Sequence, residues 1–432
     1  MENNNLVMEN RGIETKEAVV AEKVFWEALD LGRSGIRMLG KEDKIYRVFG
    51  SDFIEIDMET ETRFDGDVYD DFIILEAPKE SIKNKRYVKG DSMNFYHAVT
   101  KRADNTQYKT NQDNNYINFA YAIATNILKK GFSTATTEIR CGLCIPSSEY
   151  FSESGRKMKE LLTGTYRLKF PMLNDKVVIF KVEGDKLGIM PEGVVALVPL
   201  MKTKSKAKVA SNVVVVVDVG YGSTDITVAV KGKPSGNSSR SFNIGGITIE
   251  ANVARLLEEK GYGASRGNVI SAIKYGWIKQ GLVYVDISDC VVKAKEMFAE
   301  MLVDKVKEVL TASGMSPNEV GYFYFVGRSF LPSKYTGDKY DTKDLRELTL
   351  AAWPYKEVEK LELVSPIVNE DMMKETKIVI NEIEAELIGR DSVQTDEDGN
   401  LYITKEVLTT LEGEEVIPAE IANVTGVSLL LK

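Results

Sequence analysis

The stretch Val213–Val230, with the sequence VVVVVDVGYGSTDITVAV, predicts a buried β-hairpin with a polar tip. Five consecutive valines form an apolar run that is too short for a helix and rich in β-branched residues, which is typical of a strand buried on both faces. The run ends at Asp218, and a second apolar run begins after a short turn of glycines, hydroxyls and carboxylates. Such a tip offers the groups that hold a phosphate with its magnesium ion.

Composition places the chain among ordinary globular proteins. Its 432 residues suffice for two large domains or three ordinary ones, and 43% are hydrophobic and 28% charged. The net charge of −9 gives no basis for direct nucleic-acid binding. No apolar run is long enough to span a bilayer, and the polar N-terminus does not resemble a signal peptide. We therefore expect a cytoplasmic protein with neither membrane nor nucleic acid as a direct partner.

The cysteines and the histidine give little indication of a disulfide framework, a metal site or a catalytic site. Three cysteines predict a reducing compartment and no disulfide framework. Cys141 and Cys144 form a CxxC, but without a second pair we interpret them as small apolar residues on a strand rather than a metal or redox site. His97 is the one histidine of the sequence, so a chemistry that depends on several histidines is excluded.

A second hairpin of the same kind is predicted near the start of the fold. The segment from Val24, VFWEALDLGRSGIRML, is again an apolar run, a glycine-bearing turn and an apolar run. Asp30 begins its turn as Asp218 begins the other, 188 residues later (218 − 30). One Asp-x-Gly is a weak signal, because these are common turn residues. Two of them after buried strands suggest one phosphate chain held from both sides, in a cleft that can close.

Further elements follow from periodicity and turn residues. We expect a flexible extension at 1–20, and an exposed aromatic cluster at Trp353, Pro354 and Tyr355. The remaining expected elements are a helix from about 247 to 260 after Gly245-Gly246, a long helix Cys290–Ala312, a strand Val320–Val326, a charged helix Met372–Leu387, a short helix Pro418–Val424 and a last apolar strand.

Several of these stretches resemble the actin and heat-shock-chaperone ATPase superfamily. Asp218–Asp225 resembles its second phosphate motif and Asp30–Arg37 its first. Gly327-Arg328-Ser329, after a strand, resembles the adenosine motif, and Gly245-Gly246 before a helix also has a counterpart there.

Within the superfamily, three short stretches resemble the bacterial ParM-type actins, which segregate plasmids. They are Gly142–Pro146, Met190–Gly193 and Ala422–Gly426. The resemblance implies an α/β actin-like ATPase fold, with two similar domains, each a mixed β-sheet flanked by helices, and the nucleotide in the cleft between them. The implied boundaries are an extension at 1–20, domain I at 21–205 with a smaller subdomain at about 45–115, domain II at 206–415 with an unassigned segment 333–417, and a C-terminal helix and strand at 416–432 that return to domain I.

The resemblance also implies roles for individual residues. Glu192 and Asp218 would be catalytic, with Glu192 positioning or deprotonating the attacking water, and Asp30 and Asp218 would hold Mg²⁺ through its waters. The implied nucleotide-binding residues are Asp30, Gly32, Ser34, Arg37, Gly220, Gly222, Ser223, Thr224, Gly245, Gly246, Gly327, Arg328 and Ser329.

Two positions depart from the family pattern. Arg37 stands where the family usually has lysine, and its planar fork binds phosphate in a different geometry. Arg328 stands where the family favours consecutive glycines, which leaves the choice between ATP and GTP open.

The function that this resemblance implies is an ATPase or GTPase that polymerises into filaments and drives plasmid segregation. Its partners would be other copies of itself and a small DNA-binding adaptor protein on a plasmid centromere-like site. The alternative is a sugar or small-acid kinase of the same superfamily, although no additional substrate motif is found. A chaperone-like ATPase is a third reading, but 333–417 is short and charged for a peptide-binding domain. That segment could make lateral filament contacts or complete domain II.

Overall fold

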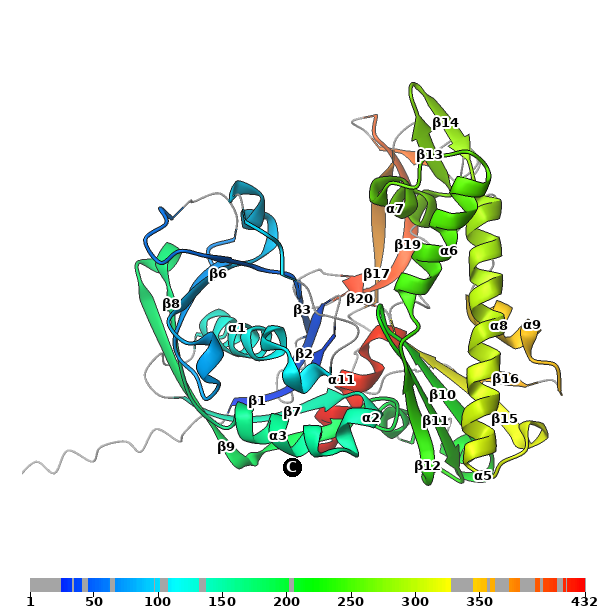
Figure 1. The fold of residues 1–432 in the computed structure, drawn as a ribbon, viewed down its shortest axis with the longest axis horizontal. Coiled ribbons are helices and arrows are strands. Elements are labelled where there is room, and N and C mark those ends of the chain that lie inside the picture. Colours follow the sequence, from blue (N-terminus) through cyan, green and yellow to red (C-terminus); the bar gives the residue numbers. More distant parts are fainter. Residues whose placement is uncertain are drawn as a thin grey trace, which may run out of the picture.

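The computed structural model describes residues 25–32, 35–40, 46–62, 67–96, 98–101, 108–131, 137–201, 206–327, 345–355, 358–361, 373–380, 393–396, 399–409, 415–416 and 418–431. Two bodies lie side by side, one holding the blue to cyan strands and the other the green to yellow ones (Figure 1). We call them domain I and domain II. The extension expected at 1–20, together with His97, lies outside the described residues.

Domain I is built on a nine-stranded mixed sheet in the order β3-β2-β1-β7-β9-β8-β5-β6-β4. Its strands are β1 (Phe25–Leu31), β2 (Ile36–Gly40), β3 (Tyr46–Phe49), β4 (Ile54–Ile56), β5 (Asp71–Glu76), β6 (Lys85–Val88), β7 (Thr137–Ile145), β8 (Gly164–Phe170) and β9 (Lys176–Pro191). Its helices are η1 (Glu80–Ile82), η2 (Gly90–Phe95), η3 (Lys109–Asn111), α1 (Asp113–Lys129), α2 (Ser147–Tyr150), α3 (Glu153–Leu162), η4 (Pro171–Leu173) and α4 (Leu197–Leu200).

Domain II is built on a five-stranded sheet in the order β12-β11-β10-β15-β16. Its strands are β10 (Val213–Val219), β11 (Thr224–Val230), β12 (Lys233–Phe242), β15 (Val320–Val326) and β16 (Glu359–Leu361), with a separate hairpin of β13 (Trp277–Gln280) and β14 (Val283–Asp286). Its helices are α5 (Lys206–Ser211), α6 (Gly246–Glu259), α7 (Arg266–Tyr275), α8 (Ser288–Ala312), η5 (Pro317–Glu319) and α9 (Leu345–Ala352).

The two sheets share one core pattern. In domain I, β3, β2 and β1 form an antiparallel meander, and β7 and then β9 continue the sheet in parallel. In domain II, β12, β11 and β10 form the same meander, and β15 and then β16 continue in parallel. The strand that bears Asp30 and the strand that bears Asp218 therefore occupy equivalent places.

The valine run is buried on both faces, as its composition predicts. Because successive side chains of a strand point to opposite faces, Val215 and Val217 pack into the core of domain II. Val214 and Val216 pack into a different cluster that also holds Ala28 of β1.

That second cluster joins the domains, and the helix α11 (Pro418–Leu430) lies at its centre (Figure 1). α11 packs against β1, β2 and β7 of domain I and against β15 of domain II. The contact is close, because a Cβ added to Gly426 would lie 1.9 Å from the carbonyl oxygen of Val195. The strand expected at the end of the chain is wrong, since the helix continues to Leu430.

The segment after β15 corrects two further expectations. The helix expected over Met372–Leu387 is wrong where the structure describes it, because Met373–Ile380 is the strand β17. It pairs antiparallel with β19 (Leu401–Thr409) in a small sheet that also holds β18 (Gln394–Thr395) and β20 (Glu415–Val416). Trp353 is also not exposed: it packs edge-on against Phe323 in the core of domain II.

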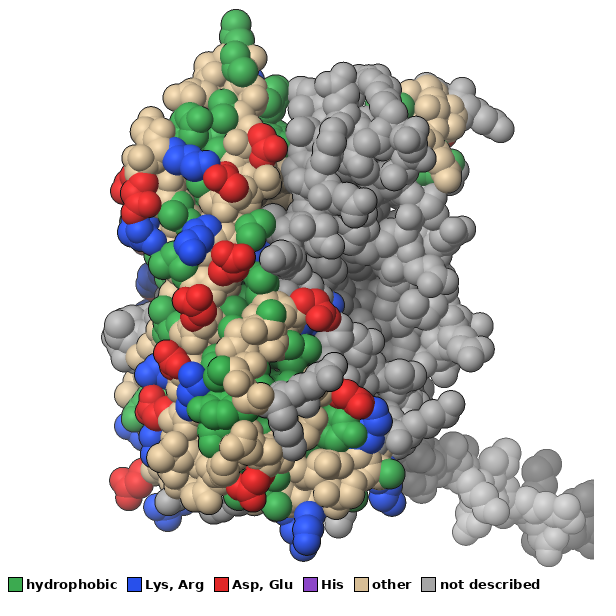
Figure 2. Space-filling view, turned by 90° about the vertical axis from the view of Figure 1, so that its right-hand side faces the viewer, with side chains coloured by type: hydrophobic (Ala, Val, Ile, Leu, Met, Phe, Trp, Pro, Cys, Tyr) green, Lys and Arg blue, Asp and Glu red, His purple; other side chains and the backbone are tan. Residues whose placement is uncertain are grey.

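The outer face of domain II carries mixed charge. Figure 2 shows Lys and Arg side chains interspersed with Asp and Glu over the described part of this face. Ion pairs three or four residues apart, such as Arg255–Glu259 and Lys305–Glu308, lie along α6 and α8. None of the described helices combines the length and the apolar character needed to cross a membrane.

The close approach of α11 to Val195 predicts that Gly426→Ala destabilises the protein. The added methyl group must displace backbone, so we expect the free energy of unfolding to fall by about 1–3 kcal/mol in urea denaturation. Ser428→Ala on the same helix is the control, because the buried hydroxyl of Ser428 has no hydrogen-bond partner among the described residues. Wild-type stability of Gly426→Ala would contradict this packing.

Candidate functional site

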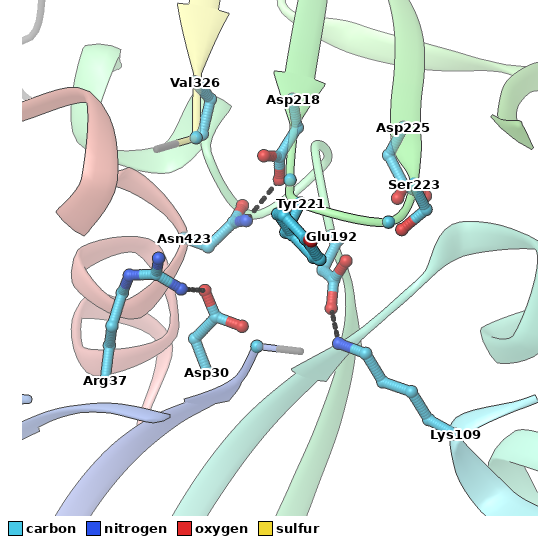
Figure 3. Close-up of a pocket in the computed structure, with 14 residues that line it drawn as sticks. Asp30, Arg37, Lys109, Glu192, Asp218, Tyr221, Ser223, Asp225, Val326 and Asn423 are labelled. Atoms are coloured by element: carbon cyan, nitrogen blue, oxygen red, sulfur yellow. Dashed lines mark hydrogen bonds and ion pairs between the residues drawn. The ribbon is translucent and has the colours of Figure 1, made fainter. Parts of the chain in front are cut away.

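Residues from both domains and from α11 line one cavity, which is partly open to solvent (Figure 3). Domain I contributes Asp30, Gly32, Arg37, Lys109 and Glu192, domain II contributes Asp218, Gly220, Tyr221, Gly222, Ser223, Asp225, Val326 and Gly327, and α11 contributes Asn423. The sequence-predicted residues from both hairpins thus meet in space.

The two hairpins present different groups at equivalent positions. Asp30 lies opposite Arg37 in the register of β1 and β2, and Asp218 lies opposite Asp225 in the register of β10 and β11. Arg37 donates from Nη1 to Oδ2 of Asp30 over 3.4 Å, and both side chains are buried. Domain I therefore offers a paired aspartate with a guanidinium, and domain II offers two carboxylates.

Glycines bring backbone to the cavity wall. A Cβ on Gly32 would lie 2.5 Å from the carbonyl oxygen of Gly35 and 2.7 Å from Nη1 of Arg37. Gly327 has φ +99°, and a Cβ there would lie 2.7 Å from Oδ1 of Asp218. In the domain II turn, the N–H of Gly220 donates to the carbonyl of Ser223 over 2.9 Å. A side chain at Gly32 or Gly327 would therefore clash with the protein's own atoms, so these turns can pack closely only with glycine.

Some sequence-predicted site residues support the turn without lining the cavity. Gly246 N–H donates to the carbonyl of Gly220, and a Cβ on Gly245 would lie 2.6 Å from that same oxygen. The hydroxyl of Thr224 is turned away and donates to the carbonyl of Ile244 over 2.8 Å. Alternation along β11 explains this, because Ser223 and Asp225 point into the cavity and Thr224 points to the other side. Ser34, Arg328 and Ser329 lie outside the described residues.

Glu192 follows β9, and its carboxylate is paired with a lysine that the sequence does not single out. Nζ of Lys109 lies 2.5 Å from Oε1 of Glu192, and both side chains are buried. Glu149 of α2 fixes the lysine segment by accepting the backbone N–H groups of Lys109 and Thr110 over 2.9 and 3.2 Å. No spacing signal identifies Lys109, since it lies in a polar loop 83 residues before Glu192.

Burial and crowding raise the pKa values of the carboxylates. Burial, reinforced by Asp225 and Asp30, raises the pKa of Asp218 to about 7. Burial also raises the pKa of Glu192 well above its ordinary range, although Lys109 opposes the shift. Burial lowers the pKa of Lys109, but the carboxylates of Glu192 and Asp30 outweigh it and hold that pKa above its usual value.

The cavity holds an excess of negative charge that suits a divalent cation. Its four carboxyl groups, on Asp30, Glu192, Asp218 and Asp225, face two cations, Lys109 and Arg37, which leaves two negative charges (4 − 2) when all are ionised. Buried charge without compensation is unfavourable, and carboxylates are ligands that Mg²⁺ prefers. The residues present therefore fit this ion.

One group of side chains around Asp30 is close enough together to coordinate a metal ion. Ligand atoms of Asp30, Cys144 and Glu192 lie within 4.8 Å of one another. Burial raises the pKa of the Cys144 thiol well above its ordinary value, so this residue stays protonated and is a poor ligand for Mg²⁺. Asp218 is outside this group and comes from the opposite wall (Figure 3).

Hydrogen bonds across the cavity tie domain I to domain II. The backbone N–H of Ser147, at the start of α2, donates to Oδ1 of Asp225 over 3.1 Å. The hydroxyl of Ser147 donates to the backbone carbonyl of Glu192 over 2.8 Å. Ser241 donates to the same oxygen of Asp225 over 2.5 Å. The placement of Glu192 therefore depends on contacts in both domains.

Comparison with known proteins identifies the fold. No protein-family model and no curated protein sequence matches the chain. Solved structures do match. The chain is similar to the actin-like protein Alp7A, with 14% identity over 94% of this chain and 96% of that chain and a TM-score of 0.60. It is similar to a ParM in a 15-stranded filament from Clostridium botulinum, with 16% identity over 79% and 96% of the chains and a TM-score of 0.59.

A third similar structure is ParM of Bacillus thuringiensis with ATP, with 12% identity over 78% of this chain and 92% of that chain and a TM-score of 0.53. The chain therefore has an actin-like fold of the ParM type, and the fold predicted from the sequence is confirmed. At these identities the likeness extends to the fold alone.

The buried ion pair between Lys109 and Glu192 predicts how the protein's stability changes when one or both of its charges are removed. Lys109→Met leaves the buried carboxylate of Glu192 without its cation, so we expect the free energy of unfolding to fall by about 3–5 kcal/mol. Lys109→Met combined with Glu192→Gln removes both charges and should recover most of that loss. Arg255→Ala, which breaks a half-exposed pair, is the control and should cost less than about 1 kcal/mol in the same urea denaturation. A fully stable Lys109→Met variant would contradict the buried pair.

The raised pKa of Asp218 predicts a pH-dependent effect of Asp218→Asn. Between about pH 4 and 7 the unfolded chain releases this proton while the folded protein keeps it, so the stability of the wild type falls as pH rises through this window. Asparagine does not titrate. In EDTA, the stability of Asp218→Asn relative to wild type should therefore be higher at pH 8 than at pH 5 by more than about 1 kcal/mol. The exposed Asp304→Asn is the control, and an equal difference at both pH values would argue against a raised pKa.

Proposed function

We propose that this chain is a nucleotide-dependent, filament-forming ATPase of the actin-like fold, which hydrolyses ATP or GTP and drives plasmid segregation. One observation carries the proposal. Two equivalent hairpins place Asp30 and Asp218 on opposite walls of one cavity that also holds the buried carboxylate of Glu192. That arrangement suits a phosphate chain held from both domains, with a carboxylate beside its terminal group.

The two hairpin tips would bind the phosphates. Gly32 on one side and Gly220 and Gly222 on the other allow close approach of phosphate oxygens to backbone N–H groups, and the hydroxyl of Ser223 adds a donor. Arg37 supplies a guanidinium, which binds phosphate oxygens through its fork of donors. Ser34 would add a hydroxyl to this set.

Asp30 and Asp218 would hold magnesium through its waters, one from each domain. Bound there, Mg²⁺ would neutralise charge on the phosphate oxygens. The cavity's excess of carboxylates supports this role, because two of its negative charges lack a counter-charge when all four groups are ionised.

Glu192 would position or deprotonate the water that attacks the terminal phosphate, with Asp218 assisting. Two features support this role. The backbone of Glu192 is fixed, because its N–H donates to Ile145 and its carbonyl accepts from Ser147. Its carboxylate also lines the cavity beside Asp218 and Asp225, where a terminal phosphate and the attacking water would lie. Lys109 would hold the carboxylate in place until an anionic phosphate enters and offers the ammonium a second partner.

The adenosine side would be formed by Gly327 with Arg328 and Ser329, and Gly245 and Gly246 would hold the phosphate turn from behind. Filament formation is proposed from the likeness to a ParM solved as a filament. A small DNA-binding adaptor on a plasmid site would link the filament to DNA, which agrees with the net charge of −9.

Phosphate release and light scattering with ATP, GTP and a non-hydrolysable analogue test this function. We expect polymers with at least one nucleotide, and hydrolysis slowed about 10²–10⁴-fold by Glu192→Ala with nucleotide affinity nearly unchanged. Polymers of Glu192→Ala should therefore persist longer than those of wild type. Glu258→Ala, exposed on α6, is the matched control. Hydrolysis of Glu192→Ala at the wild-type rate would refute the role of Glu192, and the absence of nucleotide-dependent polymers over several salt concentrations would refute filament formation.

A further inference from the structure

The C-terminal stretch Ala422–Gly426 contributes a side chain that bridges the two walls of the cavity. Asn423 is buried on α11, and its amide points toward Asp218 (Figure 3). Its Nδ2 donates to Oδ2 of Asp218 over 2.5 Å, and its Oδ1 accepts the backbone N–H of Gly193 over 3.3 Å. It thus contacts a carboxylate of domain II and the residue that follows Glu192 in domain I.

The partners of Asn423 settle which way its amide faces. A backbone N–H can only donate, so the group that faces Gly193 must be the amide oxygen. The amide nitrogen therefore faces Asp218, where it can only donate. This fixed direction leaves Asn423 complementary to an acceptor oxygen of Asp218, and not interchangeable with an acidic residue of the same shape.

The helix that carries Asn423 is fixed against the same segment of domain I. Gly426 lies so close to Val195 that an added Cβ would come within 1.9 Å of its carbonyl oxygen. Val195 in turn donates its N–H to the carbonyl of Pro191 over 3.2 Å, which closes the turn around Glu192. A displacement of this turn therefore moves the helix and, with it, the amide that holds Asp218.

We propose that Asn423 is a positioning residue that couples the Glu192 turn of domain I to Asp218 of domain II. The amide holds the carboxylate of Asp218 in the orientation in which it can bind the waters of a cation, and the bond to Gly193 makes that orientation depend on the position of Glu192. Because this coupling rests on the proposed function, its test needs one measurement that is independent of nucleotide. Asn423 acts through Asp218 and the Glu192 turn, and it has no part in the chemical step.

Two variants of Asn423 separate the two hydrogen bonds. Asn423→Ala loses both, whereas Asn423→Asp keeps an acceptor for Gly193 and loses the donor to Asp218. Thr425→Val is the matched control two residues away, since the buried Thr425 hydroxyl has no hydrogen-bond partner among the described residues and does not line the cavity.

In the nucleotide-free protein, thermal unfolding of a double-mutant cycle tests the bond to Asp218. We expect Asn423→Ala to lower Tm in the wild-type background. In the Asp218→Ala background the same substitution should lower Tm by less than half as much, because the hydrogen bond to Asp218 is already absent there. Loss of the Gly193 bond is common to both backgrounds and cancels. Equal Tm shifts in the two backgrounds would overturn the coupling, whatever the protein does with nucleotide.

Nucleotide binding and turnover then test the consequence. With EDTA, both Asn423 variants should bind ATP or GTP with affinity close to that of wild type. Mg²⁺ should increase the nucleotide affinity of wild type and of Thr425→Val, and this increase should be about 10–100-fold smaller in both Asn423 variants. In turnover, the kcat of these variants should fall more than their KM rises. A Mg²⁺ effect of wild-type size in Asn423→Asp would overturn the positioning role. A wild type that binds neither nucleotide would instead refute the proposed function, and the cycle would still decide whether Asn423 holds Asp218.

Discussion

Four carboxyl groups and only two cations lie in one buried space between the two sheets. The carboxyl groups therefore need further hydrogen-bond partners, and this need constrains how the two domains are arranged. A buried carboxylate is tolerated only when it is paired or hydrogen-bonded. Asp30 is paired with Arg37 of its own hairpin, but the other three draw a partner from a distant part of the chain. Lys109 comes from a loop before α1, Ser147 from the start of α2 and Asn423 from α11. The requirement to satisfy these carboxylates therefore brings the loop, the short helix and the last helix to one place.

The fold pattern is repeated in the two domains, but the chemistry is not. Arg37 and Asp225 occupy the same position opposite the aspartate of each hairpin, and they carry opposite charges. Domain I adds Lys109 and Glu192 to its arginine, and domain II adds a glycine-rich turn with a hydroxyl. A single hairpin would offer only half of the groups that a charged ligand and its counter-ion need. The two walls of the cavity therefore have equivalent backbones but different charge, because both cations, Arg37 and Lys109, lie on the domain I wall.

The sequence was informative where the signal is local and silent where it depends on tertiary contact. Both hairpins, with Asp30 and Asp218, were predictable because strand composition and turn residues lie within a few positions of each other. Lys109 was not, because its role comes from a residue 83 positions away. Gly426 favoured a helix end, yet α11 continues through it, since the glycine serves close packing against Val195. At Met373–Ile380 charged residues favoured a helix, but β-branched residues and pairing with β19 prevailed.

The position of α11 along the chain has a consequence for the order of folding. Synthesis runs from the N-terminus, so both sheets leave the ribosome before the helix that fills the space between them. Each domain has an apolar core of its own and can form that core early. The cluster that joins them requires Ala422, Val424 and Val427, which are made after every strand of both sheets. A partly made chain thus carries both hairpins without the residue that bridges them, and the cavity is completed only after translation has passed Gly426.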